Sequence, residues 1–179
     1  DGGSQTGSYA AFVQDIWELT KDVAYINLGL RGSYHTINST VLDTNRKYGS
    51  FEINNLAYSA NAGLSLLPSK NHKISLNISS GYRTPNLDDV TKIYESNLFI
   101  QVNNPDVKPE MAINYEINST NKIGDDINLE LGAYYTSIRD YIKNVATTIN
   151  GNSSETINGQ NYIYQKLSNA SSAYILGGY

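Results

Sequence analysis

The sequence predicts an all-β fold, an antiparallel up-and-down meander of about eight strands taken from a transmembrane β-barrel. Apolar and polar residues alternate with the two-residue period of a strand along most of the chain, and no segment follows the period of a helix. The expected strands of about 9 to 13 residues exceed the usual soluble length. Strands of this length cross a bilayer when they are tilted.

Four strands show the alternation most clearly. In residues 56–66, Leu, Tyr and Ala occupy one face, while Ser, Asn and Gly predominate on the other. Residues 72–82, 111–119 and 127–136 repeat this pattern, with Tyr82 placed on the apolar face. Charged residues between the ends of these strands fall on the polar face. Because Lys or Arg facing lipid near mid-membrane costs roughly 2–4 kcal/mol, this segregation favours a wall between lipid and a watery bore.

Four further strands complete the meander, and the connections alternate in length. Residues 24–36 alternate clearly, whereas residues 8–19 cannot be oriented because Asp15 shares a face with apolar residues. Weaker strands are expected at 161–167 and 172–179. The short connections lie at about 20–23, 67–71, 124–126 and 168–171, and the long ones at about 37–55, 83–109 and 137–160.

This alternation favours a membrane barrel. Outer-membrane barrels join their strands by short periplasmic turns and long extracellular loops. A soluble β-sandwich mixes connection lengths more freely. We expect no substantial helix beyond a turn in residues 86–93, where Asp88 and Asp89 open it.

The composition excludes several other classes. Charged residues make up 17% of the chain, below the roughly 25% of soluble domains. The 15 Tyr residues suit the boundary between lipid and water, where aromatic girdles lie. The absence of Cys excludes thiolate metal sites, disulfides and Cys nucleophiles. The net charge of −4, with no basic patch, argues against a nucleic-acid partner.

Two sequence boxes carry a family resemblance. Residues 80–89 read Ser-Gly-Tyr-Arg-Thr-Pro-Asn-Leu-Asp-Asp, and residues 104–110 read Asn-Pro-Asp-Val-Lys-Pro-Glu before a strand containing Asn-Tyr-Glu. They resemble the barrel of TonB-dependent outer-membrane receptors, where one box ends a strand and the other begins the next. Residues 9–15 and 28–31 resemble further strands of that family, and residues 169–177 resemble a turn and strand of it, so the likeness covers nearly the whole chain.

The resemblance implies a fragment of a receptor. Residues 1–179 would be part of the C-terminal barrel domain, without the N-terminal plug, and the chain also lacks an initiator Met and a signal peptide. The intact protein would be a barrel of roughly 22 strands in the outer membrane of a Gram-negative bacterium. It would import a scarce nutrient, namely an iron–siderophore, haem, cobalamin or glycan. Its partners would be that small molecule, the lipid bilayer and, through the plug, the TonB complex; no enzymatic activity and no cofactor are implied.

Five residues are candidates for ligand binding. Arg31 and His35 fall on the polar face of the strand at 24–36, with His35 near its outer end. Arg83, Asn86 and Tyr94 lie at or within a long loop. Some haem importers of the family carry a His between the two boxes, and the absence of His from that interval weakens haem as the ligand. Tyr94 keeps haem open, because Tyr can ligate ferric haem.

Three other functions compete with the receptor. The first is a self-contained eight-stranded outer-membrane barrel with an adhesion or structural role. The second is an outer-membrane protease or lipase, which would need Ser, His and acidic residues on one rim, and His35 has no obvious partner there. The third is a soluble carbohydrate-binding sandwich. No residue is assigned as catalytic or as a metal ligand, since no catalytic or metal-binding motif is present.

Overall fold

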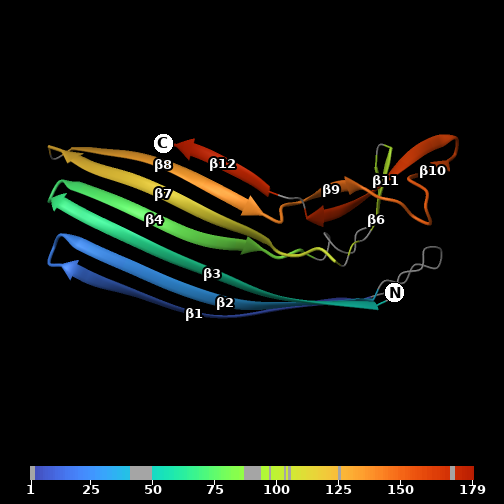
Figure 1. Ribbon diagram of the computed structural model, residues 1–179, viewed down its shortest axis with the longest axis horizontal. Helices are drawn as coiled ribbons and strands as arrows, with labels where there is room; N and C mark the ends of the chain where they lie inside the picture. The colour runs from blue at the N-terminus through green and yellow to red at the C-terminus, as the bar shows by residue number, and fades with distance from the viewer. Residues whose placement is uncertain are drawn as a thin grey trace.

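The structure is a computed structural model that describes residues 3–40, 50–86, 94–96, 98–102, 104, 106–124, 126–169 and 172–179. The described residues form two β-sheets and no helix long and apolar enough to cross a membrane. Figure 1 shows one long sheet and a smaller one beyond its end, where the long connections lie. We call them the wall sheet and the loop sheet.

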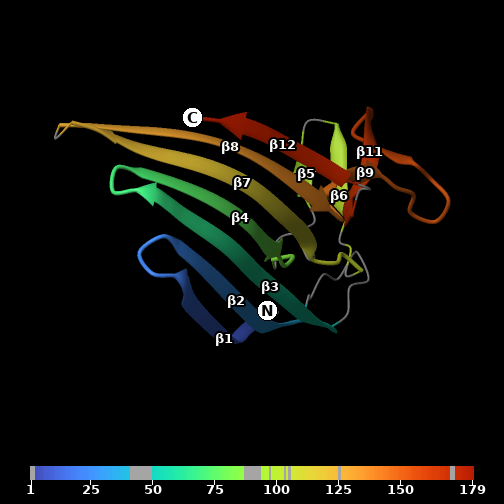
Figure 2. The ribbon, with the colours of Figure 1, turned by 60° about the vertical axis from the view of Figure 1, so that its left-hand side comes forward.

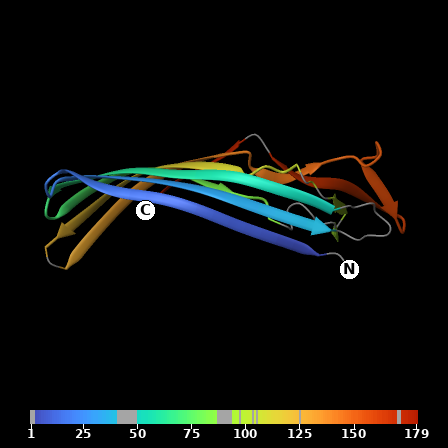
Figure 3. The same cartoon turned by 90° about the horizontal axis from the view of Figure 1, so that it is seen from below.

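The wall sheet is a seven-stranded antiparallel meander in the order β1-β2-β3-β4-β7-β8-β12. Figures 2 and 3 show that it is curved and twisted, as expected of part of a barrel wall. Its strands are β1 (Ser4–Thr20), β2 (Ala24–Thr40), β3 (Ser50–Ser69), β4 (His72–Arg83), β7 (Glu110–Ile123), β8 (Ile127–Arg139) and β12 (Ser172–Gly178).

The loop sheet is built from the two longest connections. Its strands are arranged β10-β11-β6-β5, with β9 also pairing to β11. The β6–β11 pairing is parallel, unlike every pairing described in the wall. The bounds are β5 (Tyr94–Ser96), β6 (Phe99–Val102), β9 (Ile142–Ala146), β10 (Ser154–Ile157) and β11 (Gln160–Asn169).

The all-β meander is confirmed, but the strand predicted at 161–167 is not the eighth strand of the wall. That segment lies in β11, whose partners are β6, β9 and β10. Instead β12 pairs directly with β8, from Ser172 opposite Arg139 to Gly178 opposite Ala133. The two-residue period identifies a strand but carries no information on which sheet the strand joins. The short connection predicted at 168–171 is therefore a step between sheets.

Short and long connections still alternate along the seven strands. The short ones, 21–23, 70–71 and 124–126, all lie at the end of the wall far from the loop sheet (Figure 1). Two backbone positions with positive φ help to close them, Asp22 at 59° and Gly124 at 65°. The turn predicted in 86–93, with Asp88 and Asp89, falls almost entirely outside the described residues.

Cross-strand register places apolar side chains on one face of the wall, the apolar face. One row runs from Trp17 through Ile26, Leu64 and Leu76 to Ile117, across five strands. The register also orients β1, which the sequence left open, and puts Asp15 on this face opposite Leu28.

This apolar face is not the interior of a sandwich. Leu76 is 43% exposed and Leu131 is 54% exposed, although both point from the middle of long strands. The ring of Tyr135 lies 6.4 Å from that of Tyr115 and 6.3 Å from that of Tyr174, measured between centroids. Such a row of aromatic rings across neighbouring strands is the arrangement of a membrane girdle.

The buried core lies at the other end, where the wall meets the loop sheet. Ile37 of β2 and Ile53 of β3 pack there with Val107, Ile142 and the partly buried Leu167. We call these five residues the rim core. They join the ends of two wall strands to both long connections, so the loop sheet rests on the wall.

Candidate ligand-binding surface

The second face of the wall, the polar face, is covered by hydrogen-bonded amides. Asn27 lies opposite Gly63, and Asn61 lies opposite Gly29. The Asn61 amide donates to Asn27 Oδ1 at 2.9 Å. A Cβ on Gly29 would lie 2.2 Å from Asn61 Oδ1, so the glycines make the room in which the two amides meet.

A second polar network lies on the same face across β7, β8 and the chain end. Asn118 donates to Glu130 Oε1 at 2.7 Å and approaches Tyr179 Oη at 2.9 Å. The Tyr179 hydroxyl donates to Glu116 Oε1 at 3.0 Å. A cavity of about 500 Å³ follows this face and is lined by residues that include Gln14, Asn27, Asn61, Ser75, Asn77, Glu116 and Asn118. The polar face therefore suits contact with water or with polar groups.

Nearer the loop sheet, two aromatic residues of β2 and β4 meet. His35 Nε2 lies 3.4 Å from Tyr82 Oη, and the rings meet edge to face with their centroids 5.8 Å apart. Described pairing of β3 with β4 ends at Asn61 and Ser79, and β4 then continues along β7 alone. The alternation that predicts Tyr82 on the apolar face continues in its pairing with β7, where Tyr82 lies opposite Met111. Beyond the end of the pairing with β3, its hydroxyl reaches His35.

Arg31 occupies the same face as His35, further down β2. Its Nε donates to Ser33 Oγ at 3.2 Å, and Ser33 is buried. Arg31 also lines a cavity of about 260 Å³ together with Gln14, Asn61 and Ser79. A guanidinium in such a place can donate to carboxylate or other anionic oxygens of a bound molecule.

Arg83 ends β4 and is joined to the start of β7 by an ion pair. Its Nε lies 2.8 Å from Glu110 Oε2, and the other Glu110 oxygen accepts the Ile142 N–H at 2.5 Å. Burial raises the pKa of Glu110, but the hydrogen bonds from Arg83 and Ile142 outweigh it and hold that pKa below its usual value. The Glu110 carboxylate is thus charged and fixes where the loop beginning at 140 leaves β8.

The five predicted site residues do not gather at one point. His35 and Arg31 share the polar face, and Arg83 is at the rim. Asn86 is exposed just beyond β4. Tyr94 lies in β5 opposite Gln101, and its side chain lies outside the described residues. Sequence reasoning missed Tyr82 as a partner of His35, although its place at a strand end before Arg-Thr-Pro marks where regular pairing stops.

The described residues hold no cluster of three or more His, Cys, Asp or Glu side chains suited to a metal ion. The polar contacts described above join amides, hydroxyls and carboxylates, with the guanidinium groups of Arg31 and Arg83 and the imidazole of His35. Such a surface can bind a polar or anionic molecule, with the pair of His35 and Tyr82 beside the rim.

Comparison with known proteins identifies the fold. Residues 1–177 match the family described as TonB dependent receptor-like, beta-barrel. No curated protein matches the chain by sequence. Among solved structures, the copper transporter OprC aligns with a TM-score of 0.73 and 15% identity, over 98% of this chain and 25% of that chain.

Two further structures show the same fold. The ferric yersiniabactin uptake receptor FyuA from Yersinia pestis aligns with a TM-score of 0.64 and 20% identity, over 99% of this chain and 24% of that one. The Serratia marcescens hemophore receptor HasR, solved with its hemophore HasA and heme, aligns with a TM-score of 0.72 and 12% identity, over 97% and 31%. This chain thus spans about a quarter to a third of these receptors.

The family match and the architecture agree. The matched family consists of transport receptors of the Gram-negative outer membrane, and the wall sheet has the meander, the uncovered apolar face and the long loops of such a barrel. This chain belongs to the TonB-dependent receptor β-barrel family.

Proposed function

We propose that this chain is part of an outer-membrane receptor that binds a scarce nutrient and imports it with energy supplied through TonB. One observation carries the proposal beyond the family match: the wall has an uncovered apolar face and a hydrogen-bonded polar face that leads to two long, structured loops. Lipid would cover the first face, and the second would face the bore. Residues 1–179 are then one stretch of the barrel domain, and the plug that contacts TonB lies outside them.

The polar face and rim would contact the nutrient. His35 and Arg31 present an imidazole and a guanidinium on the polar face, and the phenol of Tyr82 contacts His35. Arg83, Asn86 and Tyr94 are the further candidates at the rim and in the loop. These groups suit an oxygen-rich, anionic molecule such as a ferric siderophore, with haem, copper, cobalamin and glycans as the other classes to be tested.

The self-contained eight-stranded barrel receives no support. The described wall has seven strands, and β1 and β12 stand at opposite edges without pairing to each other. Nor does any described cluster favour catalysis. A closed wall needs further strands against both edges, as a larger receptor barrel would supply.

The test is ligand binding by the intact receptor reconstituted in bilayer discs. The panel comprises a ferric tris-catecholate, a ferric tris-hydroxamate, haemin, Cu²⁺, cobalamin and a mixed oligosaccharide set. We expect one class to bind, and His35→Ala to weaken its binding about tenfold, on the order of the 1.4 kcal/mol of one lost polar contact.

His72→Ala is the matched control. His72 lies at the opposite end of the wall, where its ring nitrogen contacts Asn121. It should leave binding unchanged. Equal loss in both variants would reject the His35 assignment, and binding of no class would reject nutrient import.

A further inference from the structure

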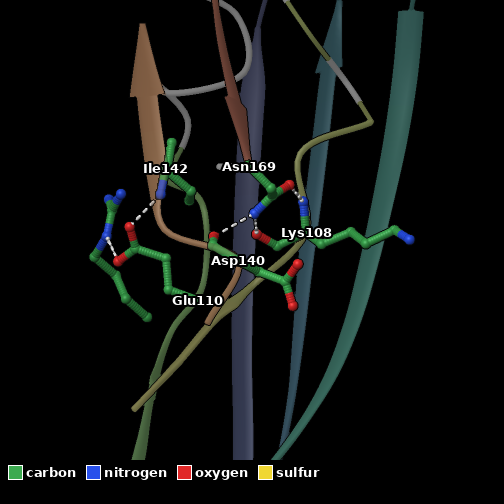
Figure 4. A network of polar contacts seen from close by, with 6 residues as sticks. Lys108, Glu110, Asp140, Ile142 and Asn169 are labelled. Atoms are coloured by element: carbon green, nitrogen blue, oxygen red, sulfur yellow. Dashed lines mark hydrogen bonds and ion pairs between the residues drawn. The ribbon is translucent and has the colours of Figure 1, made fainter. Parts of the chain in front are cut away.

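Beside the rim, a side chain of one long connection forms hydrogen bonds with the backbone of the other, although the two segments are far apart in the sequence. Figure 4 shows Asn169, the last residue of β11, reaching Lys108 and Asp140. Its Oδ1 accepts the Lys108 N–H at 2.8 Å, and its Nδ2 donates to the Lys108 carbonyl at 2.9 Å. The same Nδ2 donates to the Asp140 carbonyl at 2.6 Å. One amide thus pairs with both backbone groups of Lys108, as a neighbouring strand residue would.

Other contacts join the same two connections. Asn104 Nδ2 donates to the Leu167 carbonyl at 2.8 Å, and Asn104 is buried. Glu110 accepts the Ile142 N–H while it pairs with Arg83. Between these anchors, β6 and β11 run parallel from the Phe99–Ile163 pair to the Val102–Lys166 pair.

The rim core then fixes this assembly to the wall. Val107 comes from the first connection, and Ile142 and Leu167 come from the second. Val107 and Ile142 share one buried cluster with Ile37 and Ile53, near the ends of β2 and β3, and Leu167 packs against that cluster. Two independent flaps would not share a parallel strand pair, a three-bond amide clamp and one apolar core.

We propose that the two loops form a single rigid unit, the roof. It is held together by Asn169 and packs on the ends of β2 and β3. Resting on the proposed function, this means that a nutrient touching either loop meets a surface positioned by both. Opening one loop alone would break the clamp, the β6–β11 pairing and part of the rim core at once.

The test measures the distance between the loops in the intact receptor without ligand. The chain has no Cys, so in a background freed of any other Cys, spin labels can be placed at the exposed positions Asp106 and Thr156. We expect one narrow distance distribution in the parent. In Asn169→Ala, and in the isosteric Asn169→Asp, which loses both donors, the distribution should become at least about twofold broader. Asn161→Ala, an exposed Asn in the same strand, is the control and should stay narrow.

A disulfide provides a second measurement that does not depend on the folding of Asn169 variants. Val102 and Lys166 are direct partners of adjacent strands, at a spacing that suits a disulfide. Val102→Cys with Lys166→Cys should oxidise nearly completely. Failure to oxidise, or equally narrow distributions in both Asn169 variants, would overturn the roof. Because no ligand is used, a receptor that passes this test but binds nothing in the panel would refute only the proposed function.

Discussion

The wall sheet and the loop sheet are both antiparallel-rich β-structure, yet they keep their apolar side chains in opposite places. In the wall, large apolar residues such as Leu131 stand exposed on one face. In the loop sheet, Ile100 is 1% exposed and Tyr164 is buried, with its hydroxyl on Glu155 Oε2 at 2.8 Å. Apart from Ala57 within β3, the buried hydrophobic residues of the described part lie in the loop sheet, just before β7, or at the loop ends of β2 and β3.

The difference shows which solvent each sheet requires. A loop sheet in water must bury its own apolar side chains, because their transfer from water provides most of its stability. A wall sheet in a bilayer needs no such core, since lipid covers its apolar face and strand pairing satisfies the backbone. The comparison therefore predicts that the two sheets respond differently to the same kind of substitution.

The largest effect should follow from a cavity in the loop sheet. Ile100→Ala removes a fully buried side chain and should cost about 2–5 kcal/mol of local stability. Amide hydrogen exchange should accelerate in β6 and β11 while the wall strands keep their protection. Acceleration across both sheets would show that they unfold as one unit, contrary to the comparison.

An Arg substituted at an equally exposed position in each sheet should distinguish a side chain that faces lipid from one that faces water. Leu76 of β4 is 43% exposed and Ile163 of β11 is 42% exposed, so exposure alone predicts equal effects. Leu76→Arg should cost roughly 2–4 kcal/mol in a bilayer, because it places a cation against lipid. Ile163→Arg should change stability by no more than about 0.5 kcal/mol. Equilibrium unfolding in lipid vesicles measures both, and similar costs would mean that the apolar face does not meet lipid.

The wall could be read from the sequence because each of its strands carries its own two-sided pattern. Leu64 and Leu76 fall on the apolar face by local alternation, and the register confirms that they are neighbours. The loop sheet could not be read in this way. Its central pairing joins Phe99 of the first connection to Ile163 of the second, with β7 and β8 between them in the sequence, and no local period specifies such a partner.

The residues of the candidate site also differ in whether local alternation could predict them. Arg31 and His35 were placed on the polar face because that face follows from alternation along β2. Tyr82 was missed because its contact depends on where β4 separates from β3. The box containing Lys108 and the turn at Asn169 were recognised as motifs, but the hydrogen bonds between them depend on tertiary structure.

The smallest expected effect is the pH dependence of the ion pair between Arg83 and Glu110, where the two sheets join. Glu110 is charged at neutral pH and its pKa lies below the usual 4.5, so its stabilising contribution is complete above that value and is lost as pH falls through the lowered pKa. With Arg83 46% exposed, the pair contributes about 0–1 kcal/mol.

The distribution of loop distances from labels at Asp106 and Thr156 should therefore stay constant between about pH 8 and pH 5, and broaden only below pH 4.5. Glu110→Gln should abolish this acid response while His35→Ala retains it, because the Ile142 N–H at the junction donates to Glu110 and not to His35. Broadening already at pH 6 would point instead to a histidine. It would show that the Glu110 carboxylate, which joins β7 to the roof, is not the group that controls the loop distance.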